Sequence, residues 1–548
     1  MAEMDSRSQD THVSDTPETS SRPGATKTTA TPLTAALPDG LVARLAGAIV
    51  TGSHRQTYTL YAPFTGEPIG ELPQSAPGDV QLAFEKARKA QAAWAARPVE
   101  ERTAVLLRAH DLMLQRQAEI LDIIQIENGK ARLHAFEEIA ELAQVCRYYA
   151  RTAKSHLKPR RRAGVFPIAT KTYEIRHPKG VVGIISPWNY PLALGAADAV
   201  PAFAAGNAVV SMPDMQTPLT ALWARELFIE AGLPADLWQV VVGEGPVIGP
   251  SVVDHADYVS FTGSTRTGRQ VAQQAAYGLV GCSLELGGKN PMIVLEDADL
   301  DKAVEGAIRG CFASAGQLCV SIERLYVHHA VYQEFLERFV KRTRSLRLGA
   351  ALDFSADVGS LTSKRQLETV RRHVEDARAK GAKVVAGGIA RPDIGPYFFE
   401  PTILTGVHRD MLVYAEETFG PVVSVYPVKS AEDAILKAND TKYGLNASVW
   451  TRDIRRARAL AERIKAGTVN VNEAYAAAYG SVDAPMGGMG DSGLGRRHGA
   501  EGILKFTEVQ NVAIQRFVPF APAFGLDARR WTRLLTTSLS LMKKLGKK

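Results

Sequence analysis

Apolar residues change from helical to strand-like spacing near residue 180. Before that point they recur every three or four positions, as at Val80, Ala83, Ala87 and Ala90, which is the spacing of one helix face. The run Val181–Ile185 is then continuously apolar and ends in a turn. A short run of this kind predicts a strand that is buried on both faces, as in a parallel sheet.

Beyond residue 180, strand-like runs alternate with helix-like stretches in two series. The helix-like stretches of the first series are Ala196–Ala205, Leu219–Ala231 and Gly268–Ala276, and its strand-like runs are Ala208–Val210, Val240–Val242 and Asp257–Phe261. The second series runs from about residue 290 to 475, with strands expected at Arg324–Val327, Lys383–Ala386, Val422–Tyr426 and Ser448–Trp450. Such alternation predicts βαβ units, so we expect two α/β domains.

The ends of the chain differ from this body. Residues 1–36 are rich in Ser, Thr, Pro and Asp and offer little to bury, which predicts a disordered leader. The first residues carry mixed charge and no apolar stretch, so they do not resemble a secretory signal. No apolar run reaches the ~18 residues that a transmembrane helix needs.

The net charge of +7 has its origin in the C-terminal segment 528–548. Seven of the 65 Lys and Arg residues lie there without any acid, which leaves 58 to match the 58 Asp and Glu. The charge therefore gives no reason to expect nucleic-acid binding. One face of a helix would gather Trp531, Leu534, Leu535, Leu541, Met542 and Leu545. This pattern resembles an interfacial amphipathic helix, so a membrane surface is one expected partner; a solvated or self-docked tail is the alternative.

The four cysteines are too few and too irregularly spaced for a disulfide framework or a zinc pattern: Cys146, Cys282, Cys311 and Cys319. This usage indicates a reducing cytoplasm, and we expect no metal site.

Three residues stand where chemistry could occur. Cys319 follows Gly316-Gln317-Leu318, where small residues give access to sulfur, although a single Cys is more often a core thiol. Glu285 precedes a double-glycine turn that brings backbone close to a ligand, although an acid there is more often a cap or a solvated residue. Asn189 follows the first buried strand, at the strand end where α/β proteins bind ligands, although an Asx turn would also explain it.

Two glycine-containing turns follow predicted strands. The segment Phe261–Gly268 reads as strand, turn and helix start, a geometry in which helix amides can bind an anion. The segment Gly243–Gly245 is a second such turn. Neither is specific alone.

Six segments in a fixed order together resemble the aldehyde dehydrogenase superfamily over about residues 45–515. These are Pro187–Pro191, Phe261–Gly268, Glu285–Asn290, Gly316–Cys319, Glu416–Pro421 and Pro485–Gly488. The interval of 34 residues from Glu285 to Cys319 is typical of that family. Within it the chain looks most similar to a subgroup labelled NADP-dependent succinate-semialdehyde dehydrogenase.

The resemblance implies a fold and a domain organisation. It implies two Rossmann-like α/β domains plus a small β oligomerisation extension, assembled as a homodimer or homotetramer. We expect a leader (1–36), a dinucleotide-binding domain (37–158 and 179–286), a catalytic domain (287–484), oligomerisation strands (159–178 and 500–516) and a basic amphipathic tail (517–548).

The resemblance also implies a metal-free oxidation of a small aldehyde to a carboxylic acid with NADP or NAD. Cys319 would be the nucleophile that forms a thiohemiacetal and then a thioester. Asn189 would stabilise the oxyanion, and Glu285 would activate the hydrolytic water. The implied cofactor contacts are Trp188, Met212, Met215, Gly263, Ser264, Gly268, Leu286, Glu417 and Phe419.

Several positions depart from the family pattern. Met212 and Met215 replace the usual Lys and Glu of the adenosine-ribose motif, which removes a charge-assisted bond and a repulsion of the 2′-phosphate, so the choice between NADP and NAD stays open. Ser314 replaces an Asn near the nucleophile. Ala197 and Ala313 stand where related enzymes hold the succinate-semialdehyde carboxylate with arginines, which favours a less charged aldehyde.

Three alternatives follow from these features. A CoA-acylating enzyme on the same fold would lack the water-activating acid, so Glu285 argues against it. A non-catalytic binding or structural descendant conflicts with the intact set of Cys319, Asn189 and Glu285. A medium-chain, fatty or aromatic aldehyde dehydrogenase, held to the membrane surface by its tail, would share the same chemistry.

Overall fold

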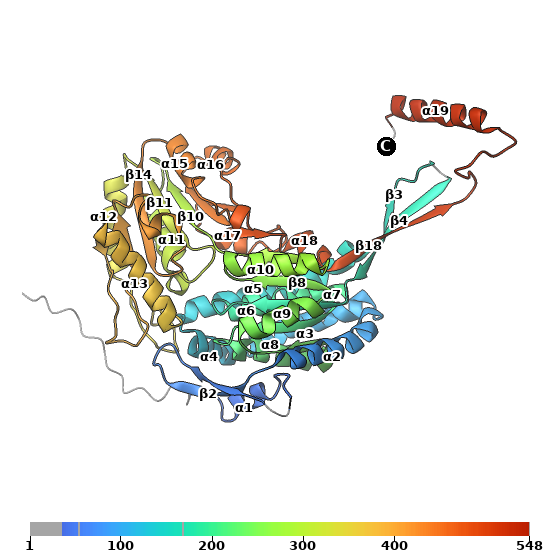
Figure 1. Cartoon of the computed structure of the whole chain (residues 1–548). Helices are drawn as coiled ribbons and strands as arrows, with labels where there is room; N and C mark the ends of the chain where they lie inside the picture. The colour runs from blue at the N-terminus through green and yellow to red at the C-terminus, as the bar shows by residue number, and fades with distance from the viewer. Residues whose placement is uncertain (1–35, 53–54, 167–168, 547–548) are drawn as a thin grey trace, which may run out of the picture.

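Two mixed but mainly parallel sheets lie side by side, and an antiparallel arm projects from one of them (Figure 1). The computed structural model describes residues 36–52, 55–166, 169–546. Most of the expected leader therefore lies outside the described residues. The α/β class is confirmed, and both predicted series of alternating elements are present.

The first sheet has six strands in the order β17-β9-β8-β5-β6-β7. Its core strands are parallel, and only the short β17 pairs antiparallel, with β9. The strands are β5 (Val181–Ser186), β6 (Ala208–Pro213), β7 (Trp238–Val240), β8 (Tyr258–Thr262), β9 (Gly281–Glu285) and β17 (Gly493–Leu494). The continuous burial of β5, β6 and β8 explains their unbroken apolar sequence.

Helices cover both faces of this sheet, as parallel strands require. They are α2 (Pro77–Ala95), α3 (Val99–Gln115), α4 (Gln117–Asn128), α5 (Arg132–Leu157), α6 (Pro191–Ala196), α7 (Ala199–Ala205), α8 (Pro218–Glu230), α9 (Gly245–His255), α10 (Thr265–Tyr277) and α18 (Gly499–Leu504). The short α1 (Leu41–Ala46) and the hairpin of β1 (Thr57–Tyr61) and β2 (Pro68–Pro73) pack below them (Figure 1).

The second sheet has seven strands in the order β12-β13-β14-β11-β10-β15-β16, of which only β12 is antiparallel to its neighbour. They are β10 (Asn290–Val294), β11 (Ile322–His328), β12 (Lys383–Ala386), β13 (Thr402–Thr405), β14 (Val422–Val428), β15 (Asn446–Trp450) and β16 (Thr468–Val471). The helices are α11 (Leu300–Phe312), α12 (Tyr332–Arg344), α13 (Lys364–Ala379), α14 (Leu412–Ala415), α15 (Ala431–Ala438), α16 (Ile454–Ala461) and α17 (Ala476–Tyr479).

The arm is a three-stranded antiparallel sheet of β3 (Arg160–Arg162), β4 (Thr170–Pro178) and β18 (Thr507–Gln515). The segments 159–178 and 500–516, expected as oligomerisation strands, thus contain β4 and β18, which pair with each other within one chain. Beyond the arm, α19 (Ala528–Lys544) lies apart from the body (Figure 1). No helix among the described residues is both long and apolar enough to cross a bilayer.

Two predicted elements differ from the observed ones. The expected helix Ala196–Ala205 corresponds mainly to α7, which begins at Ala199, while Ala196 ends the preceding α6. Between the two helices, the Asp198 carboxylate accepts hydrogen bonds from Ser260 and Arg497. The expected strand Val240–Val242 begins two residues early, at Trp238. It ends at Val240, and Ser75 makes the backbone hydrogen bonds of Val242.

Candidate active site

Cys319 lies in the loop between α11 and β11, at the junction of the two sheets. A tight turn leads into it, with left-handed φ values of 51° at Ser314 and 54° at Ala315. Gly316, at φ 70°, passes so close to the Gly420 carbonyl that an added Cβ would lie 2.1 Å from its oxygen. The Ser314 hydroxyl is buried and has no hydrogen-bond partner among the described residues. The loop is therefore fixed by backbone packing rather than by a side-chain contact from Ser314.

Asn189 reaches this loop from the carboxyl end of β5. Its side chain is 3% exposed, and its Nδ2 donates a hydrogen bond of 3.0 Å to the Gln317 carbonyl, two residues before Cys319. The amide expected to stabilise an oxyanion thus lies beside the nucleophile loop.

A buried ion pair holds the Asn189 segment, and we call it the aldehyde-side pair: Lys130 and Glu138, 2.7 Å apart. Lys130 Nζ also donates to the Asn189 carbonyl. Glu138 accepts hydrogen bonds from the backbone N–H of Leu192 (2.8 Å) and Ala193 (3.1 Å). Because both charges are fully satisfied, the pair fixes the backbone on either side of the amide.

Glu285 ends β9, opposite Thr262 of β8. Its side chain is 8% exposed. Burial raises the pKa of Glu285 to about 7, an effect that the nearby charges of Arg497 and Lys505 oppose. A carboxyl with this pKa can accept a proton near neutral pH.

The charges of two acids, Glu285 and Glu417, act on the Cys319 thiol. Burial first, and then Glu285 and Glu417, raise its pKa to about 12, while Arg497 opposes the shift. The thiol is therefore protonated at neutral pH in this structure, and forming the thiolate requires transfer of its proton to a base.

A second buried ion pair, which we call the cofactor-side pair, joins Lys289 and Glu323. Glu323 accepts hydrogen bonds of 3.0 Å from the backbone N–H groups of Thr418 and Phe419. Phe419 has a φ of 53°, an unusual value for a bulky residue. The pair therefore stabilises a strained turn between Glu417 and Gly420.

Glu417 turns toward the loop after Glu285. Its Oε1 accepts a 2.7 Å hydrogen bond from the Gly288 N–H. Burial first, and then Glu323, raise the pKa of Glu417 to about 8. The Phe419 ring meets Trp188 edge to face, with centroids 5.5 Å apart. These residues come from three segments, namely the loop after β9, the turn that contains Glu417 and Phe419, and the segment of Trp188.

The other expected cofactor residues line the carboxyl ends of the first sheet. Ser264 caps α10 by accepting the Thr267 N–H, and the Gly263 N–H donates to the Glu285 carbonyl. Gly268 packs on Leu286, where an added Cβ would lie 2.5 Å from Leu286 Cδ2. These contacts bring the first turn of α10 against the segment that carries Glu285.

Met212 and Met215 flank the expected adenosine site. Met212 is 5% exposed, and its Cε is the nearest group to an added Cβ at Gly245, at 4.0 Å. Met215 is half-buried, and its carbonyl accepts a 3.0 Å hydrogen bond from Tyr58. The open space at Gly245, beside the N-terminus of α9, leaves room for the ribose and phosphate of a nucleotide.

The opposite side of Cys319 is apolar and aromatic. Packed around it are Tyr190, Ala193, Leu194, Ala313, Leu318, Val320, Tyr475, Tyr479 and Met486. Glu137 accepts hydrogen bonds from Tyr190 (3.1 Å) and Tyr475 (2.9 Å). Ala313 lies in this aromatic cluster, whereas Ala197 packs into the first sheet's core.

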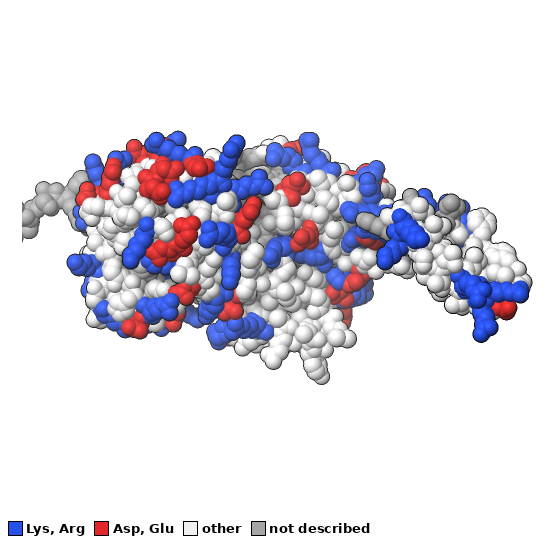
Figure 2. All heavy atoms as spheres, turned by 90° about the horizontal axis from the view of Figure 1, so that it is seen from above, with Lys and Arg blue, Asp and Glu red and all other residues white. Residues whose placement is uncertain are grey.

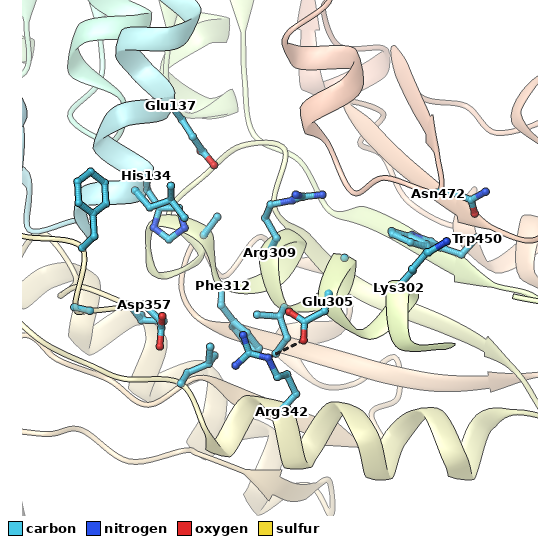
Figure 3. Close-up of a pocket in the computed structure, with 18 residues that line it drawn as sticks. His134, Glu137, Lys302, Glu305, Arg309, Phe312, Arg342, Asp357, Trp450 and Asn472 are labelled. Carbon is cyan, nitrogen blue, oxygen red and sulfur yellow. Dashed lines mark hydrogen bonds and ion pairs between the residues drawn. The ribbon is translucent and has the colours of Figure 1, made fainter. Parts of the chain in front are cut away.

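A cavity of about 520 Å³ adjoins the aromatic cluster through Glu137 and Ala313. Figure 3 shows Glu137 of α5 and Arg309 of α11 facing it from two sides. Within the described residues, no group of three or more His, Cys, Asp or Glu could hold a metal ion.

Comparison with known proteins identifies the class. The profile of the aldehyde dehydrogenase family matches residues 49–512, and the chain belongs to this family. A Mycolicibacterium smegmatis protein, provisionally named an NADP-dependent succinate-semialdehyde dehydrogenase, is 53% identical over 90% of this chain and 95% of its own.

Two solved structures are also similar. An NADP-dependent enzyme from E. coli is 36% identical, with a TM-score of 0.81 over 84% of this chain and 95% of its own. Betaine aldehyde dehydrogenase from Staphylococcus aureus, in complex with NAD+, is 30% identical, with a TM-score of 0.81 over 87% and 95%.

The sequence reasoning missed the residues that support the site. Lys130, Glu138 and Arg497 make the buried contacts described above, and none was singled out. Their charges gave little signal: Glu137 and Glu141 flank Glu138 in α5, so its buried pairing with Lys130 resembles a solvated helix face in the sequence.

Proposed function

We propose that this chain oxidises an aldehyde to a carboxylic acid through covalent catalysis at Cys319. The observation that carries the proposal is the convergence of Asn189 and Glu285 on one thiol from separate elements. The amide lies against the Cys319 loop, and the charge of Glu285 acts on the thiol.

The steps follow from these positions. The Cys319 thiol releases its proton to solvent as the sulfur attacks the aldehyde carbon and forms a thiohemiacetal, whose oxyanion accepts hydrogen bonds from the Asn189 side chain and the Cys319 N–H. Transfer of hydride from that carbon to the cofactor leaves a thioester. Glu285 takes a proton from water, whose oxygen attacks the thioester carbon. The carbon–sulfur bond then breaks, the carboxylic acid leaves, and the proton on Glu285 passes to the sulfur and restores the thiol.

NADP or NAD supplies the hydride acceptor when bound, as the names of the E. coli and S. aureus structures indicate for those proteins. Glu417 and Phe419 would hold its nicotinamide end, with Trp188 and Leu286 beside them. Gly263, Ser264 and Gly268 would meet the pyrophosphate at α10. Met212 and Met215 would contact the adenosine ribose without a charge, which leaves both cofactors acceptable.

The proposed aldehyde is succinate semialdehyde, for which the M. smegmatis relative is provisionally named. A second candidate is an apolar or aromatic aldehyde. The tyrosines and aliphatic residues around Cys319 favour it, as do the alanines at positions 197 and 313.

A steady-state matrix of aldehydes against both cofactors tests this proposal. We expect NAD(P)H formation that depends on aldehyde and is lost in Cys319→Ala. Preference for succinate semialdehyde over butanal and benzaldehyde supports the first substrate, and the reverse order supports the second. Turnover that requires CoA would contradict hydrolysis through Glu285. No turnover and no cofactor binding would favour a non-catalytic descendant.

We further propose assembly as a homodimer or homotetramer in the cytoplasm, with the arm at the contact between subunits. Its outer strand β18 leaves Val509 and Ile514 exposed. Light scattering of the wild type against a chain with Val509→Lys and Ile514→Lys tests the arm; an unchanged mass would contradict it.

For the tail, we propose that α19 binds an anionic membrane surface. Leu534, Leu541 and Leu545 are each more than half exposed, and basic side chains lie at both ends of the helix, at the tip of the arm (Figure 2). Vesicles with phosphatidylserine should sediment the full chain but not a chain that ends at Asp527. Equal binding of the two would remove α19 from the proposal.

A further inference from the structure

The cavity of Figure 3 borders the aromatic cluster on the aldehyde side of the site. Its inner wall contains Glu137 and Ala313, and both also touch the aromatic cluster around Cys319. A substrate whose aldehyde carbon lies at Cys319 would therefore extend its far end toward this cavity.

Four groups lining the cavity could in principle supply a positive charge, and three of them are unsuited to an anion. Burial lowers the pKa of His134 to about 4, so this imidazole is neutral at neutral pH. Arg342 Nε donates to Glu305 at 2.7 Å, and its Nη1 donates to Ser345. Lys302 lies at the first turn of α11, where it pairs with Asp299.

Arg309 is the fourth, and it lies nearest the aromatic cluster. It precedes Ala313 by one helical turn, and the Ala313 N–H donates to the Arg309 carbonyl. Its guanidinium is also paired with an acid, because Nη2 donates to both oxygens of Glu473. Its Nε and Nη1, however, have no hydrogen-bond partner among the described residues. Its charge acts on both Glu137 and Tyr475.

The deeper cations near Cys319 are already committed. Lys130 is fully buried between Glu138 and the Asn189 carbonyl. Arg497 pairs with Asp198 at 3.0 Å. Because Nε and Nη1 of Arg309 lie on different edges of the guanidinium, each can donate a single charge-assisted hydrogen bond to a carboxylate at the edge of this partly closed cavity.

We propose that Arg309 binds a carboxylate at the far end of the aldehyde, so that the site selects short aldehydes that carry a second, anionic end. This inference rests on the proposed function and deepens its substrate class. Arg309 would provide the succinate-semialdehyde carboxylate with a positively charged partner, which the alanines at positions 197 and 313 cannot do. The small Ala313 side chain leaves room between that carboxylate and Cys319.

The test compares succinate semialdehyde with butanal, which has the same four carbons and no carboxylate. In Arg309→Gln, kcat/KM for succinate semialdehyde should fall roughly 10- to 100-fold, mainly through KM, as expected for the loss of a charged hydrogen bond. Butanal turnover should change by less than about twofold, which also shows that the variant folds. Arg309→Lys should retain part of the wild-type value, because the ammonium keeps the positive charge and a single donor.

Two further variants separate Arg309 from its surroundings. Arg338→Gln, which breaks a surface pair with Asp301 outside the cavity, should leave both substrates unchanged. Glu473→Gln frees Arg309 and should keep or lower KM for succinate semialdehyde.

The outcomes separate this inference from the proposed function. A wild type that prefers succinate semialdehyde, together with an Arg309→Gln variant that keeps that preference, would overturn the role of Arg309 alone. A selective loss in Arg342→Gln instead of Arg309→Gln would also overturn it. A wild type without any preference would overturn both the substrate and this inference, while oxidation of butanal would still support the chemistry at Cys319.

Discussion

Two buried Lys–Glu pairs flank Cys319, and they support the site in different ways. In the aldehyde-side pair both members reach the functional segment, because Lys130 Nζ donates to the Asn189 carbonyl and Glu138 accepts the N–H groups of Leu192 and Ala193. In the cofactor-side pair the acid alone holds the turn, because Glu323 accepts the N–H groups of Thr418 and Phe419. The same residue types thus hold a carbonyl and amides on one side and only amides on the other.

This difference predicts different effects on catalysis when the lysine of each pair is replaced. Removing either lysine leaves a buried carboxylate without its counterion, a cost in stability that the two sides share. Only Lys130 also touches the catalytic segment itself. Lys289 acts on the Phe419 turn through Glu323.

Glu285 lies between the two pairs and gives the largest expected kinetic effect. Glu285→Gln should lower hydrolysis of the thioester by about 10²- to 10⁴-fold, the usual contribution of a general base. Because burial raises the pKa of Glu285 to about 7, the wild-type rate should rise with pH as the carboxylate forms and level off above about pH 8. For the Glu285→Gln variant, stopped-flow measurement should show a burst of NAD(P)H formation followed by slow turnover.

The variant itself supplies the control for this pH profile. Glutamine cannot titrate, so the rise near pH 7 should vanish while the burst amplitude remains. If the rate of Glu285→Gln still rose with a midpoint near pH 7, a group other than Glu285 would be responsible for the pH dependence.

Lys130→Met and Lys289→Met test whether the two pairs are alike in stability. Each should lower the free energy of unfolding by about 3–5 kcal/mol, since a buried carboxylate loses its partner. Chemical denaturation measures this effect. The double changes Lys130→Met with Glu138→Leu, and Lys289→Met with Glu323→Leu, should recover part of the loss, because no unpaired charge remains.

The kinetics of these variants test whether the pairs differ in function. Lys130→Met should lower kcat with little change in cofactor KM, whereas Lys289→Met should mainly raise cofactor KM. Identical kinetic defects would show that the division into an aldehyde side and a cofactor side is wrong.

Asn189→Ala isolates the group that the aldehyde-side pair positions. Loss of one oxyanion donor typically costs about 10²- to 10³-fold in kcat. The free energy of unfolding should change far less than in Lys130→Met, because no charge is left unpaired. If Asn189→Ala lowered the free energy of unfolding as much as Lys130→Met, the stabilising role of the aldehyde-side pair could not be separated from that of the Asn189 side chain.

Met212→Lys gives the smallest expected effect, on the cofactor side alone. A lysine could donate to a ribose hydroxyl or a 2′-phosphate, which should lower KM for NADP by roughly tenfold, or about 1.5 kcal/mol. Met212→Leu is the size-matched control. If Met212→Lys lowered the KM for the aldehyde as much as the KM for NADP, residue 212 would not act specifically on the cofactor.

The sequence predicted the parallel sheets because β5, β6 and β8 are buried on both faces, which leaves an unbroken apolar signature. It also indicated the three catalytic residues in an order typical of the family: Asn189 follows a strand, Glu285 precedes a glycine turn, and Cys319 follows Gly316. It could not reveal the supporting contacts, because the Asn189 carbonyl that holds Lys130 is 59 residues away and the Asp198 partner of Arg497 is 299 residues away. The position of β18 came from the family resemblance, because its mostly exposed residues carry little periodicity.

The close packing of glycines around Cys319 has a practical consequence for protein engineering. An added Cβ at Gly288 would lie 2.7 Å from the Cys319 carbonyl oxygen, and one at Gly316 would lie 2.1 Å from that of Gly420. The three loops therefore interlock, and mutant libraries that include these glycines would mostly yield inactive clones. Libraries aimed at new aldehydes should instead vary Ala313 and Leu194, where side chains rather than backbones set the available space.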